Sequence, residues 1–525
     1  MVNALSSRAA PLRMRPRVLV VPDRSRPRTV PAGTTAVVVG AGVAGVSAAV
    51  VLAERGVRVT LLEAADTLGG RLGAWPVTLP DGTTQNVEHG FHAFFRHYYT
   101  WRDVLRRAAP DLRFLRPVGS YPVISRQWPA EDLTGLPSAP PLNLLALLAR
   151  SPSLGLRDVV SADPDVGRQL LAYDRPETTV TLDHVSAGDF LARLGMSDRA
   201  QAMLFEAFAR SFFNDQDGMS AAELVAMFHY YFLGNPEGIG FDVPDTDHLT
   251  SIWGPLAEHL RHCGADVRVG TRVERLVPTA DHRWRLELGD RALTSRHVLL
   301  ALDPAGLRNL LAASGAAARL APRLAEQVAA LRTAPPFAVT RLWLDRDVAG
   351  DRAPFSAVTR EPTLDSISCY HRLEEPSAQW ARRTGGSVLE LHSYACTAAS
   401  APEATDRMRG ELAALWPETA DARVLHLEQR FEATAPAFPP GSAGTRPGVR
   451  TDARGVRVAG DHVCLPFLAG LMERSSMSGV LAANDVLDEE GAAAEPVRGI
   501  PQRGLLAGVG RARGLSRPER NPSAR

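Results

Sequence analysis

The alternation of apolar and polar positions is most regular between residues 35 and 63. Five residues, Thr35 to Val39, are apolar or β-branched and have the length of a buried strand. A glycine-rich turn follows, and then the run VSAAVVLAERG, which has helical periodicity and stops at Gly56. The segment VRVTLLEA then restores a strand. This order of elements predicts a β-α-β unit.

Residues 35–53 carry no charge, so a membrane-spanning helix is the competing interpretation. A span needs neither glycines spaced as G-x-G-x-x-G nor an acidic strand after them. In a nucleotide-binding turn, Gly40 allows the tight turn, Gly42 lets the main chain approach a diphosphate, and Gly45 permits close packing of helix on strand. The helix N-terminus attracts the phosphates. The predicted dinucleotide contacts are Gly40, Ala41, Gly42, Val43, Ala44 and Gly45.

Glu63 lies at the end of the second strand, about twenty residues past the glycines. A carboxylate at this place accepts hydrogen bonds from ribose hydroxyls and disfavours a 2′-phosphate. The unit therefore predicts NAD or FAD as the dinucleotide.

Composition indicates an ordinary globular protein. The chain has 525 residues, 45% hydrophobic and 22% charged, which is enough for two or three domains. All 59 basic residues are arginine, and the absence of lysine excludes a Walker-type phosphate loop and Schiff-base catalysis. The four cysteines form no C-x-x-C pair, and neither G-x-S-x-G nor H-E-x-x-H occurs, so we expect no metal site and no hydrolase chemistry.

Both ends of the chain are basic. Residues 1–33 contain seven arginines and one aspartate, and residues 498–525 contain seven arginines and one glutamate. We expect disordered tails at 1–33 and 489–525. No aromatic residue interleaves with these arginines, so nucleic acid is not an expected partner. The apolar stretch VLVVP is too short for a secretory signal, and we expect a cytoplasmic protein.

The segment EAADTLGGRLGAWP places Gly69, Gly70 and Arg71 just beyond Glu63, a pattern that resembles the flavin amine-oxidase and carotenoid-desaturase superfamily. The resemblance implies an α/β flavoprotein with a Rossmann-type FAD domain and an α+β substrate domain, in the two-domain architecture of glutathione reductase. Later segments also resemble the superfamily. These are ADVRVGTRVERL, expected as paired strands, HVLLALDP, expected as the return strand, GVRVAGDHV and LMERSSMSGVLAAN.

On this resemblance, FAD contacts Gly70, Arg71 and Leu72, and the main chain of Val273 lies at the adenine. Asp461 corresponds to the acid at the ribityl or diphosphate end, and Met477 lies at the N-terminus of the closing helix near the isoalloxazine. The expected division of the chain has seven parts. They are the tail 1–33, FAD-binding segments 34–116, 253–305 and 447–488, substrate-domain segments 117–252 and 306–446, and the tail 489–525.

The stretch NVEHGFHAFFRHYYTWRDVLRRA resembles plant-type ζ-carotene and phytoene desaturases and, most closely, the carotenoid φ-ring synthases. FARSFFND, GNPEGIGFDVPDTDHLTSIWGPLAEHL and AGDHVCLPFLAGLMERSSMSG fit the same family, and the resemblance covers residues 34–488. It implies that the β-ionone ring of a carotene becomes aromatic, losing four hydrogens while one methyl group migrates from C1 to C2.

His89, His92 and Glu88 are the candidate proton acceptors in this stretch. For each histidine, a hydrogen bond to flavin or to the main chain is the alternative role. Five aromatic residues of the same stretch either stabilise a cation through their ring faces or simply pack. They are Phe91, Phe94, Phe95, Tyr98 and Tyr99.

Two apolar stretches, 140–156 and 223–234, indicate either core packing or a tunnel for a long hydrocarbon with its mouth on a bilayer. The second interpretation predicts a long apolar substrate and peripheral membrane association, and the family resemblance implies that this substrate is a carotenoid. The alternatives are an acyclic carotene desaturase or isomerase, an amine oxidase, which the missing lysine disfavours, and a lipid-binding escort protein without redox chemistry. The electron acceptor, the φ or χ type of the ring product and the oligomeric state stay open.

Overall fold

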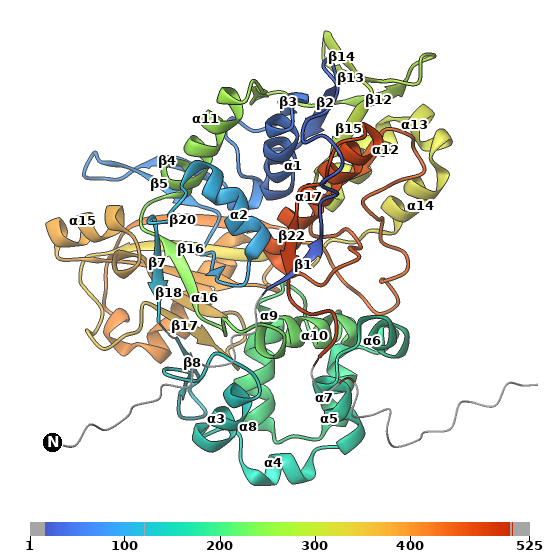
Figure 1. Ribbon diagram of the computed structural model, residues 1–525. Coiled ribbons are helices and arrows are strands. Elements are labelled where there is room, and N and C mark those ends of the chain that lie inside the picture. The colour runs from blue at the N-terminus through green and yellow to red at the C-terminus, as the bar shows by residue number, and fades with distance from the viewer. Residues whose placement is uncertain (1–15, 120, 505–506, 508–525) are drawn as a thin grey trace, which may run out of the picture.

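The structure is a computed structural model that describes residues 16–119, 121–504 and 507 (Figure 1). A five-stranded sheet in the order β11-β3-β2-β15-β21 forms the nucleotide-binding half, and all its neighbouring strands are parallel. Most strand residues are buried, as expected for a parallel sheet covered on both faces. The strands come from three distant segments. They are β2 (Thr35–Val39), β3 (Arg58–Leu62), β11 (Asp266–Arg268), β15 (His297–Leu300) and β21 (Val456–Val458).

The first helix, α1 (Val43–Glu54), packs along the last long helix, α17 (Leu471–Glu489) (Figure 1). Gly479 permits this close approach, because a Cβ there would lie 2.0 Å from the carbonyl oxygen of Ala44. The uncharged stretch is thus a strand and a core helix, as the glycine spacing predicts. Among the described residues, no helix is both long enough and apolar enough to cross a membrane.

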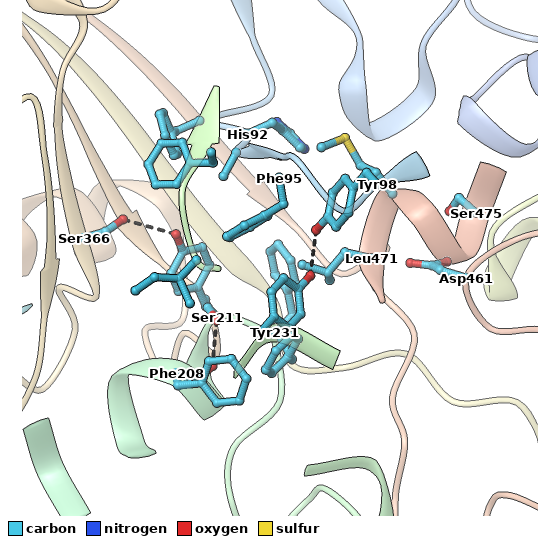
Figure 2. A pocket seen from close by; sticks show the side chains of 18 of the residues that line it. His92, Phe95, Tyr98, Phe208, Ser211, Tyr231, Ser366, Asp461, Leu471 and Ser475 are labelled. Carbon is cyan, nitrogen blue, oxygen red and sulfur yellow. Dashed lines mark hydrogen bonds between the residues drawn. The ribbon is translucent and has the colours of Figure 1, made fainter. Parts of the chain in front are cut away.

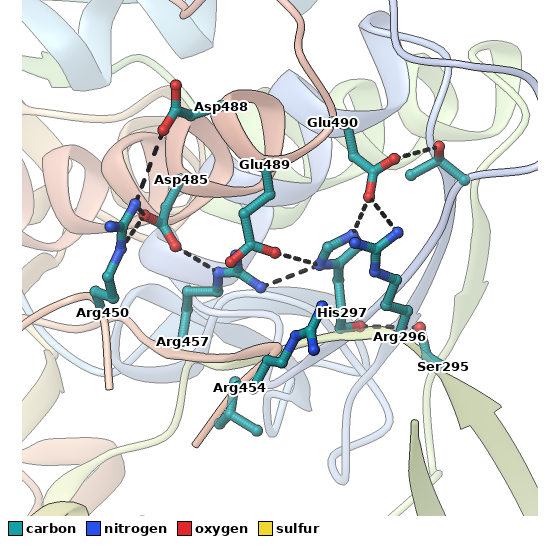
Figure 3. Close-up of polar contacts among 12 residues, drawn as sticks. Ser295, Arg296, His297, Arg450, Arg454, Arg457, Asp485, Asp488, Glu489 and Glu490 are labelled. Atoms are coloured by element: carbon teal, nitrogen blue, oxygen red, sulfur yellow. Dashed lines mark hydrogen bonds and ion pairs between the residues drawn. The ribbon is translucent and has the colours of Figure 1, made fainter. Parts of the chain in front are cut away.

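Ion pairs fix the C-terminal end of α17 on the parallel sheet (Figure 3). The buried Arg457 of β21 binds Asp485 through Nε at 2.7 Å and lies 3.0 Å from Nδ1 of His297 on β15. Nε2 of His297 donates to Glu490 at 2.9 Å. These contacts hold α17 across two strands, so the position of its N-terminus, at Leu471, is fixed as well.

A seven-stranded mixed sheet, in the order β20-β16-β19-β18-β17-β8-β9, builds the second half. Helix α16 (Ala401–Leu415) packs on it, where Thr340 and Thr405 join their hydroxyls at 2.6 Å. The hairpin of β4 (Ala74–Thr78) and β5 (Thr84–Glu88) also packs against this sheet. The sheet strands are β8 (Pro122–Ile124), β9 (Glu131–Asp132), β16 (Phe337–Leu344), β17 (Phe355–Val358), β18 (Ser366–Cys369), β19 (Ser387–Ser393) and β20 (Val424–Glu432).

A helical region lies below both sheets in Figure 1. It contains the apolar stretches at 140–156 and 223–234. Its elements are α3 (Leu142–Arg150), α4 (Leu156–Ser161), α5 (Pro164–Leu171), α6 (Arg175–Leu182), α7 (Ala187–Leu194), α8 (Asp198–Ala200), the π-helical η2 (Gln201–Glu206), α9 (Ala207–Arg210), α10 (Ala221–Phe228) and the π-helical η3 (His229–Leu233).

Smaller elements connect these parts. Two three-stranded sheets combine β6 (Phe94–Phe95), β10 (Phe241–Pro244) and β7 (Leu115–Val118), and β12 (Arg275–Pro278), β13 (Trp284–Leu288) and β14 (Arg291–Ser295). The other helices are η1 (Gly70–Leu72), α2 (Tyr99–Ala108), η4 (Leu249–Trp253), α11 (Gly254–His262), α12 (Pro304–Ala313), α13 (Gly315–Leu320), α14 (Pro322–Ala330), η5 (Tyr370–Arg372), α15 (Glu375–Thr384) and η6 (Pro417–Thr419).

Two sequence-based expectations are wrong. The strands of ADVRVGTRVERL do not pair with each other, because β11 joins the parallel sheet through β3 whereas β12 pairs with β13. The described parts of the two expected tails are ordered, because β1 (Arg17–Val20) pairs with β22 (Val497–Gly499) as an antiparallel ribbon. The buried Arg55 adds a bond to the carbonyl of Ala493 at 2.7 Å. Residues 1–15 and 508–525 lie outside the described residues.

Candidate active site

The three glycines of the β2–α1 turn occupy their positions for different structural reasons. A Cβ on Gly40, whose φ is +97°, would lie 2.4 Å from the carbonyl oxygen of Ala301, and a Cβ on Gly45 would lie 1.8 Å from that of Gly40. Packing within the protein therefore requires both glycines. At Gly42 the nearest atom to a Cβ would be the carbonyl oxygen of Gly69, at 3.8 Å. Protein packing does not require a glycine there, but a ligand diphosphate approaching the main chain does.

The N-terminus of α1 opens into a cavity. Gly42 is the N-cap residue, and none of the described side chains caps the helix or places an acid in its first turn. Val43 and Ala44 line the cavity with Gly40 and Gly42. The free N–H groups and the helix dipole fit a phosphate group.

Glu63 is held in place at the end of β3 and faces the same cavity. Its Oε2 accepts the N–H of Ala41 at 2.7 Å, and its Oε1 accepts that of Ala65 at 2.9 Å. Ala41 thus supports the acid and does not itself line the cavity. A fixed carboxylate beside the glycine turn fits a ribose diol.

The turn formed by residues 69–72 faces the glycines of the first turn. Gly69 and Gly70 have φ values of +125° and +53°, which favour glycine, and Trp253 fixes the turn by donating Nε1–H to the carbonyl of Leu72 at 2.8 Å. Gly70, Arg71 and Leu72 line the cavity.

Arg71 pairs with Asp461 at 2.6 Å, which joins two segments 390 residues apart in the chain. Burial raises the pKa of Asp461, but Arg71, with smaller contributions from His462 and Arg474, turns the net shift downward. Asp461 and Val273 both line the cavity. The pair brings one cation and one anion to the wall beside the glycine turn.

Met477 does not line the cavity, contrary to the expectation. Helix α17 begins at Leu471, so Met477 falls in its second turn and is fully buried. The cavity is lined instead by Leu471, Met472 and Ser475, which come earlier in the helix. Leu471 has a φ of +47°, a strained value for a non-glycine residue. The sequence pattern located the helix but placed its start too late.

The cavity continues from the nucleotide cradle into the helical region and measures about 1390 Å³. Pockets that hold one drug-sized ligand are roughly 300–1,000 Å³, so the volume of this cavity exceeds that of a pocket for a single such ligand. Figure 2 shows aromatic side chains of the inner chamber, with Asp461 and Ser475 at one side and Phe208 at the other. Among its lining residues are Phe91, Phe95, Tyr98, Phe205, Phe208, Phe212, Phe228, Tyr231 and Phe232.

Three of the five aromatic residues expected to stabilise a cation or to pack line this chamber. They are Phe91, Phe95 and Tyr98. Phe94 is buried in β6, and Tyr99 begins α2, and neither lines the cavity. In the sequence, Tyr231 belongs only to the apolar stretch 223–234 and Phe208 only to the segment FARSFFND. Their place in the chamber depends on tertiary packing, which brings the ring of Tyr231 to 4.9 Å from that of Phe95 and to 5.9 Å from that of Phe208.

The candidate histidines line the cavity as largely buried groups. Burial, followed by the neighbouring His248, lowers the pKa of His92 to about 3, and its Nδ1–H donates to the carbonyl of Gly90 at 2.7 Å. Burial also lowers the pKa of His89, whose Nδ1 lies 3.5 Å from Glu432. Both imidazoles are neutral at physiological pH. The hydrogen bond of His92 is the main-chain alternative that the sequence analysis left open.

Glu88 is not supported as a catalytic group. It does not line the cavity, and its Oε2 accepts from Arg341 at 2.7 Å inside the protein. Arg341 is 1% exposed and also binds Glu390 at 2.8 Å. This buried cluster fixes the segment that carries His89 and His92, because Glu390 also accepts the N–H of Phe91 at 2.7 Å.

The wall formed by the seven-stranded sheet is more polar than the helical wall. Asp365, Ser366, His392 and Tyr394 line the cavity on this side, and the hydroxyls of Ser366 and Tyr394 lie 3.2 Å apart. Burial raises the pKa of Asp365 to about 6, even though Arg210 binds it at 2.7 Å. No motif marks these residues in the sequence, since they come from separate strands of a sheet that only the fold assembles.

Comparisons with known proteins agree with this geometry. The family model of flavin containing amine oxidoreductases matches residues 43–487. The carotenoid phi-ring synthase of Streptomyces griseus is 43% identical over 480 residues, covering 90% of this chain and 91% of that protein. The carotenoid phi-ring synthase of Chlorobaculum tepidum is 26% identical over 595 residues, again covering 90% and 91%.

Among solved structures, cyclohexylamine oxidase from Brevibacterium oxydans IH-35A has the same fold, with a TM-score of 0.62 at 16% identity over 87% of this chain and 99% of that one. The glycine cradle, the fixed Glu63 and the Arg71–Asp461 pair fit FAD, which this family uses. The chain belongs to the flavin containing amine oxidoreductase family, as an FAD-dependent oxidoreductase of the group that includes the carotenoid phi-ring synthases.

Proposed function

We propose that this oxidoreductase converts the β-ionone ring of a carotene into an aromatic ring, by desaturation combined with a 1,2-shift of one methyl group. The relative from Streptomyces griseus that carries the name of this activity is 43% identical over 90% of the chain. The observation that carries the proposal is the continuity of the cavity, in which the nucleotide cradle opens directly into a large aromatic and aliphatic chamber. An apolar polyene suits such a wall, because it offers few hydrogen-bonding groups.

When bound, FAD would be the hydride acceptor. The protein would provide an environment in which a hydrocarbon cation is protected from water. Removing hydride from an allylic carbon leaves a cation, which water would trap. The rings of Phe91, Phe95 and Tyr98 line the chamber, where they exclude water and where a ring face turned to the substrate would favour positive charge. The methyl shift is then a rearrangement within the substrate and needs no external donor.

The phenols in the chamber stay protonated. Burial raises the pKa of Tyr98 and of Tyr231, and their hydroxyls bond each other at 2.6 Å. A neutral, internally paired phenol is a weaker nucleophile than a phenolate. The pair thus places two aromatic rings beside the substrate without offering a reactive oxygen.

The second part of the proposal concerns substrate delivery from a membrane. Five exposed apolar side chains form the α3–α4 surface, which consists of Leu142, Leu145, Leu156, Val159 and Val160. Val159 is 50% exposed and also lines the cavity, so the chamber reaches the outside at this surface. Leu144, Leu147 and Leu148 of the same helix α3 line the cavity. An apolar surface at the mouth of an apolar chamber favours docking on a bilayer that holds the carotene.

The proposal is tested by incubating the purified holoenzyme with β-carotene, γ-carotene or lycopene in lipid vesicles. Ring aromatisation gives a product from each ring-bearing carotene that has lost four hydrogens per ring and kept every carbon. Open-chain desaturation would instead change lycopene and leave the rings intact, and this outcome would replace the proposal by an acyclic desaturase. Turnover of none of the three carotenes would refute the proposal.

A further inference from the structure

His392 is a cavity-lining histidine with a carboxylate directly behind it. Glu390 and His392 are two residues apart on β19, so their side chains share one face of the sheet. Across the neighbouring strands, His392 lies opposite Ser366 and Glu390 lies opposite Arg341. His392 lines the cavity, whereas Glu390 is completely buried.

The hydrogen bonds of the two residues determine which imidazole nitrogen is protonated. Nε2 of His392 lies 2.7 Å from Oε1 of Glu390, and the carboxylate accepts, so the proton is on Nε2. The N–H of Phe91 lies 2.7 Å from the same Oε1 and 3.2 Å from Nε2, and it donates to the nearer carboxylate oxygen, because Nε2 already carries a proton. None of the described residues forms a hydrogen bond with Nδ1. This nitrogen therefore keeps a free lone pair on a residue of the cavity wall.

The charge of Glu390 is maintained by Arg341. Burial opposes ionisation, but Arg341 and then His392 lower the pKa of Glu390 to about 2. Two further carboxyls face the guanidinium, Glu88 at 2.7 Å and Glu374 at 3.9 Å, and burial raises the pKa of both. Glu390 is consequently the member of the cluster that is most strongly held as an anion.

His92 lacks such support. Its Nδ1–H donates to a main-chain carbonyl, and burial together with the nearby His248 and His392 disfavours its protonated form. A buried imidazole accepts a proton most readily when an anion stabilises the resulting imidazolium. His392, on the side of the cavity formed by the seven-stranded sheet, has such an anion next to it, the carboxylate of Glu390.

We propose that His392 accepts the proton that leaves the ring in each desaturation and that Glu390 is its positioning residue. The proposal rests on the proposed function. In each step one ring C–H bond gives up a hydride, and the oxidised flavin is the two-electron acceptor. A C–H bond on the adjacent carbon transfers its proton to Nδ1 of His392, and its electron pair becomes the new C=C bond. The carotene loses two electrons, the flavin gains two, and the imidazole becomes an imidazolium.

The experiment compares four holoenzymes: wild type, H392Q, E390Q and H426Q. His426 and Glu428 provide a matched control, because they have the same spacing on β20 and a similar Nε2–Oε1 distance of 2.9 Å but do not line the cavity. Flavin content and carotene binding to the chemically reduced enzyme, which cannot turn over, are measured first. Flavin reduction by the carotene is then followed without oxygen across the range of about pH 5 to 9, where histidines titrate.

We expect all four proteins to retain flavin and to bind carotene. H392Q should slow flavin reduction by about 10²-fold or more, as for loss of a general base, whereas H426Q should match wild type. E390Q should also be slow, and the acid limb of its rate profile should move to lower pH, because the imidazolium loses its counter-charge. A merely structural role of Glu390 would not move this limb.

Three contrary results are distinguishable. If wild type reduces its flavin with the carotene and H392Q does so within two-fold of the same rate, His392 is not the base, and the proposed function stands. If E390Q is slow with an unshifted acid limb, Glu390 does not act through His392. If wild type binds carotenes but none of them reduces the flavin, the proposed function fails, and the role of His392 fails with it.

Discussion

The hydroxyl oxygens of Tyr98 and Tyr231 lie 2.6 Å apart inside the cavity, and this bond joins residues 133 positions apart in the chain (Figure 2). Tyr98 precedes α2, which packs against α17 of the nucleotide-binding half, whereas Tyr231 belongs to the π-helical η3 of the helical region. Both side chains are almost fully buried. The bond therefore connects the two parts of the protein between which the carotene is proposed to bind.

The first prediction concerns this bond. Y231F leaves the buried hydroxyl of Tyr98 without its partner, and we expect a loss of about 1–3 kcal/mol in the free energy of unfolding of the holoprotein. The double variant Y98F/Y231F removes both polar groups and should recover most of that loss. Denaturant unfolding of the single and double variants measures the difference. Equal losses in Y231F and the double variant would show that the hydroxyls are not coupled.

Variants of two glycines separate flavin binding from folding. In G42V the side chain projects into the cavity, because the nearest protein atom to its Cβ is 3.8 Å away. We expect a folded protein without flavin. In G45A the Cβ would lie 1.8 Å from the carbonyl oxygen of Gly40, so the fold itself should be destabilised. The flavin-to-protein ratio measures flavin binding, and thermal unfolding of the flavin-free proteins measures the stability of the fold. Full flavin content in G42V would mean that the turn does not bind the diphosphate.

Membrane docking is tested with a matched pair of exposed valines. Val160 on the α3–α4 surface is 84% exposed, and Val180 on α6 is 78% exposed. V160E and V180E add the same charge. Losing the burial of one valine in lipid costs about 1.5 kcal/mol, so V160E should weaken binding to neutral lipid vesicles about ten-fold, whereas V180E should match wild type. Co-sedimentation with the vesicles measures this, and equal binding of the two variants would assign docking to another surface.

Stability should fall in acid because histidines are buried in neutral form. His97 is 1% exposed among Phe95, Tyr98, Tyr230 and Tyr231, and burial lowers its pKa to about 3. In the unfolded chain a histidine titrates near pH 6.5, so below that pH the unfolded chain binds more protons. The contribution of His97 is present above about pH 6.5 and is lost as the pH falls towards 3.

The fourth prediction follows from this linkage. H97F should make the decline of unfolding free energy between about pH 6 and 4 shallower by about 1.4 kcal/mol per pH unit, which corresponds to one proton. Replacing the exposed His262 of α11 by glutamine should leave the slope unchanged, because this side chain meets solvent in both states. Unfolding curves at several pH values decide the outcome, and an unaltered slope in H97F would show that His97 does not titrate as proposed.

The nucleotide-binding half could be predicted closely from local pattern. The β2–α1–β3 unit, the glycine turn and Glu63 are where periodicity and spacing place them, and β15 is where the family resemblance places a strand. Each is a short-range signal, because a strand, a turn and a helix N-terminus are built from consecutive residues. The start of α17 was misjudged, since the strained Leu471 carries no helix-initiating side chain.

The polar side of the cavity, formed by the seven-stranded sheet, could not be predicted in the same way. Glu88 is a plausible base in the sequence, but in the fold it is an ion-pair partner of Arg341, which lies 253 residues further along the chain. His392 stands in no recognisable motif, and although Glu390 is only two residues away on β19, the place of His392 opposite Ser366 follows from the pairing of β18 with β19. Long-range strand register determines these contacts, and it is not encoded in any one segment.

The sequence by itself determined that the chain folds around a dinucleotide and that its middle segments are unusually apolar, because both properties depend on the order of neighbouring residues. Only the tertiary structure decided which polar groups face the chamber, which carboxylates are neutralised by Arg341 and where the chamber reaches the surface. The physical reason is that burial and charge pairing depend on atoms brought together from distant parts of the chain, and these interactions determine the protonation state of each group.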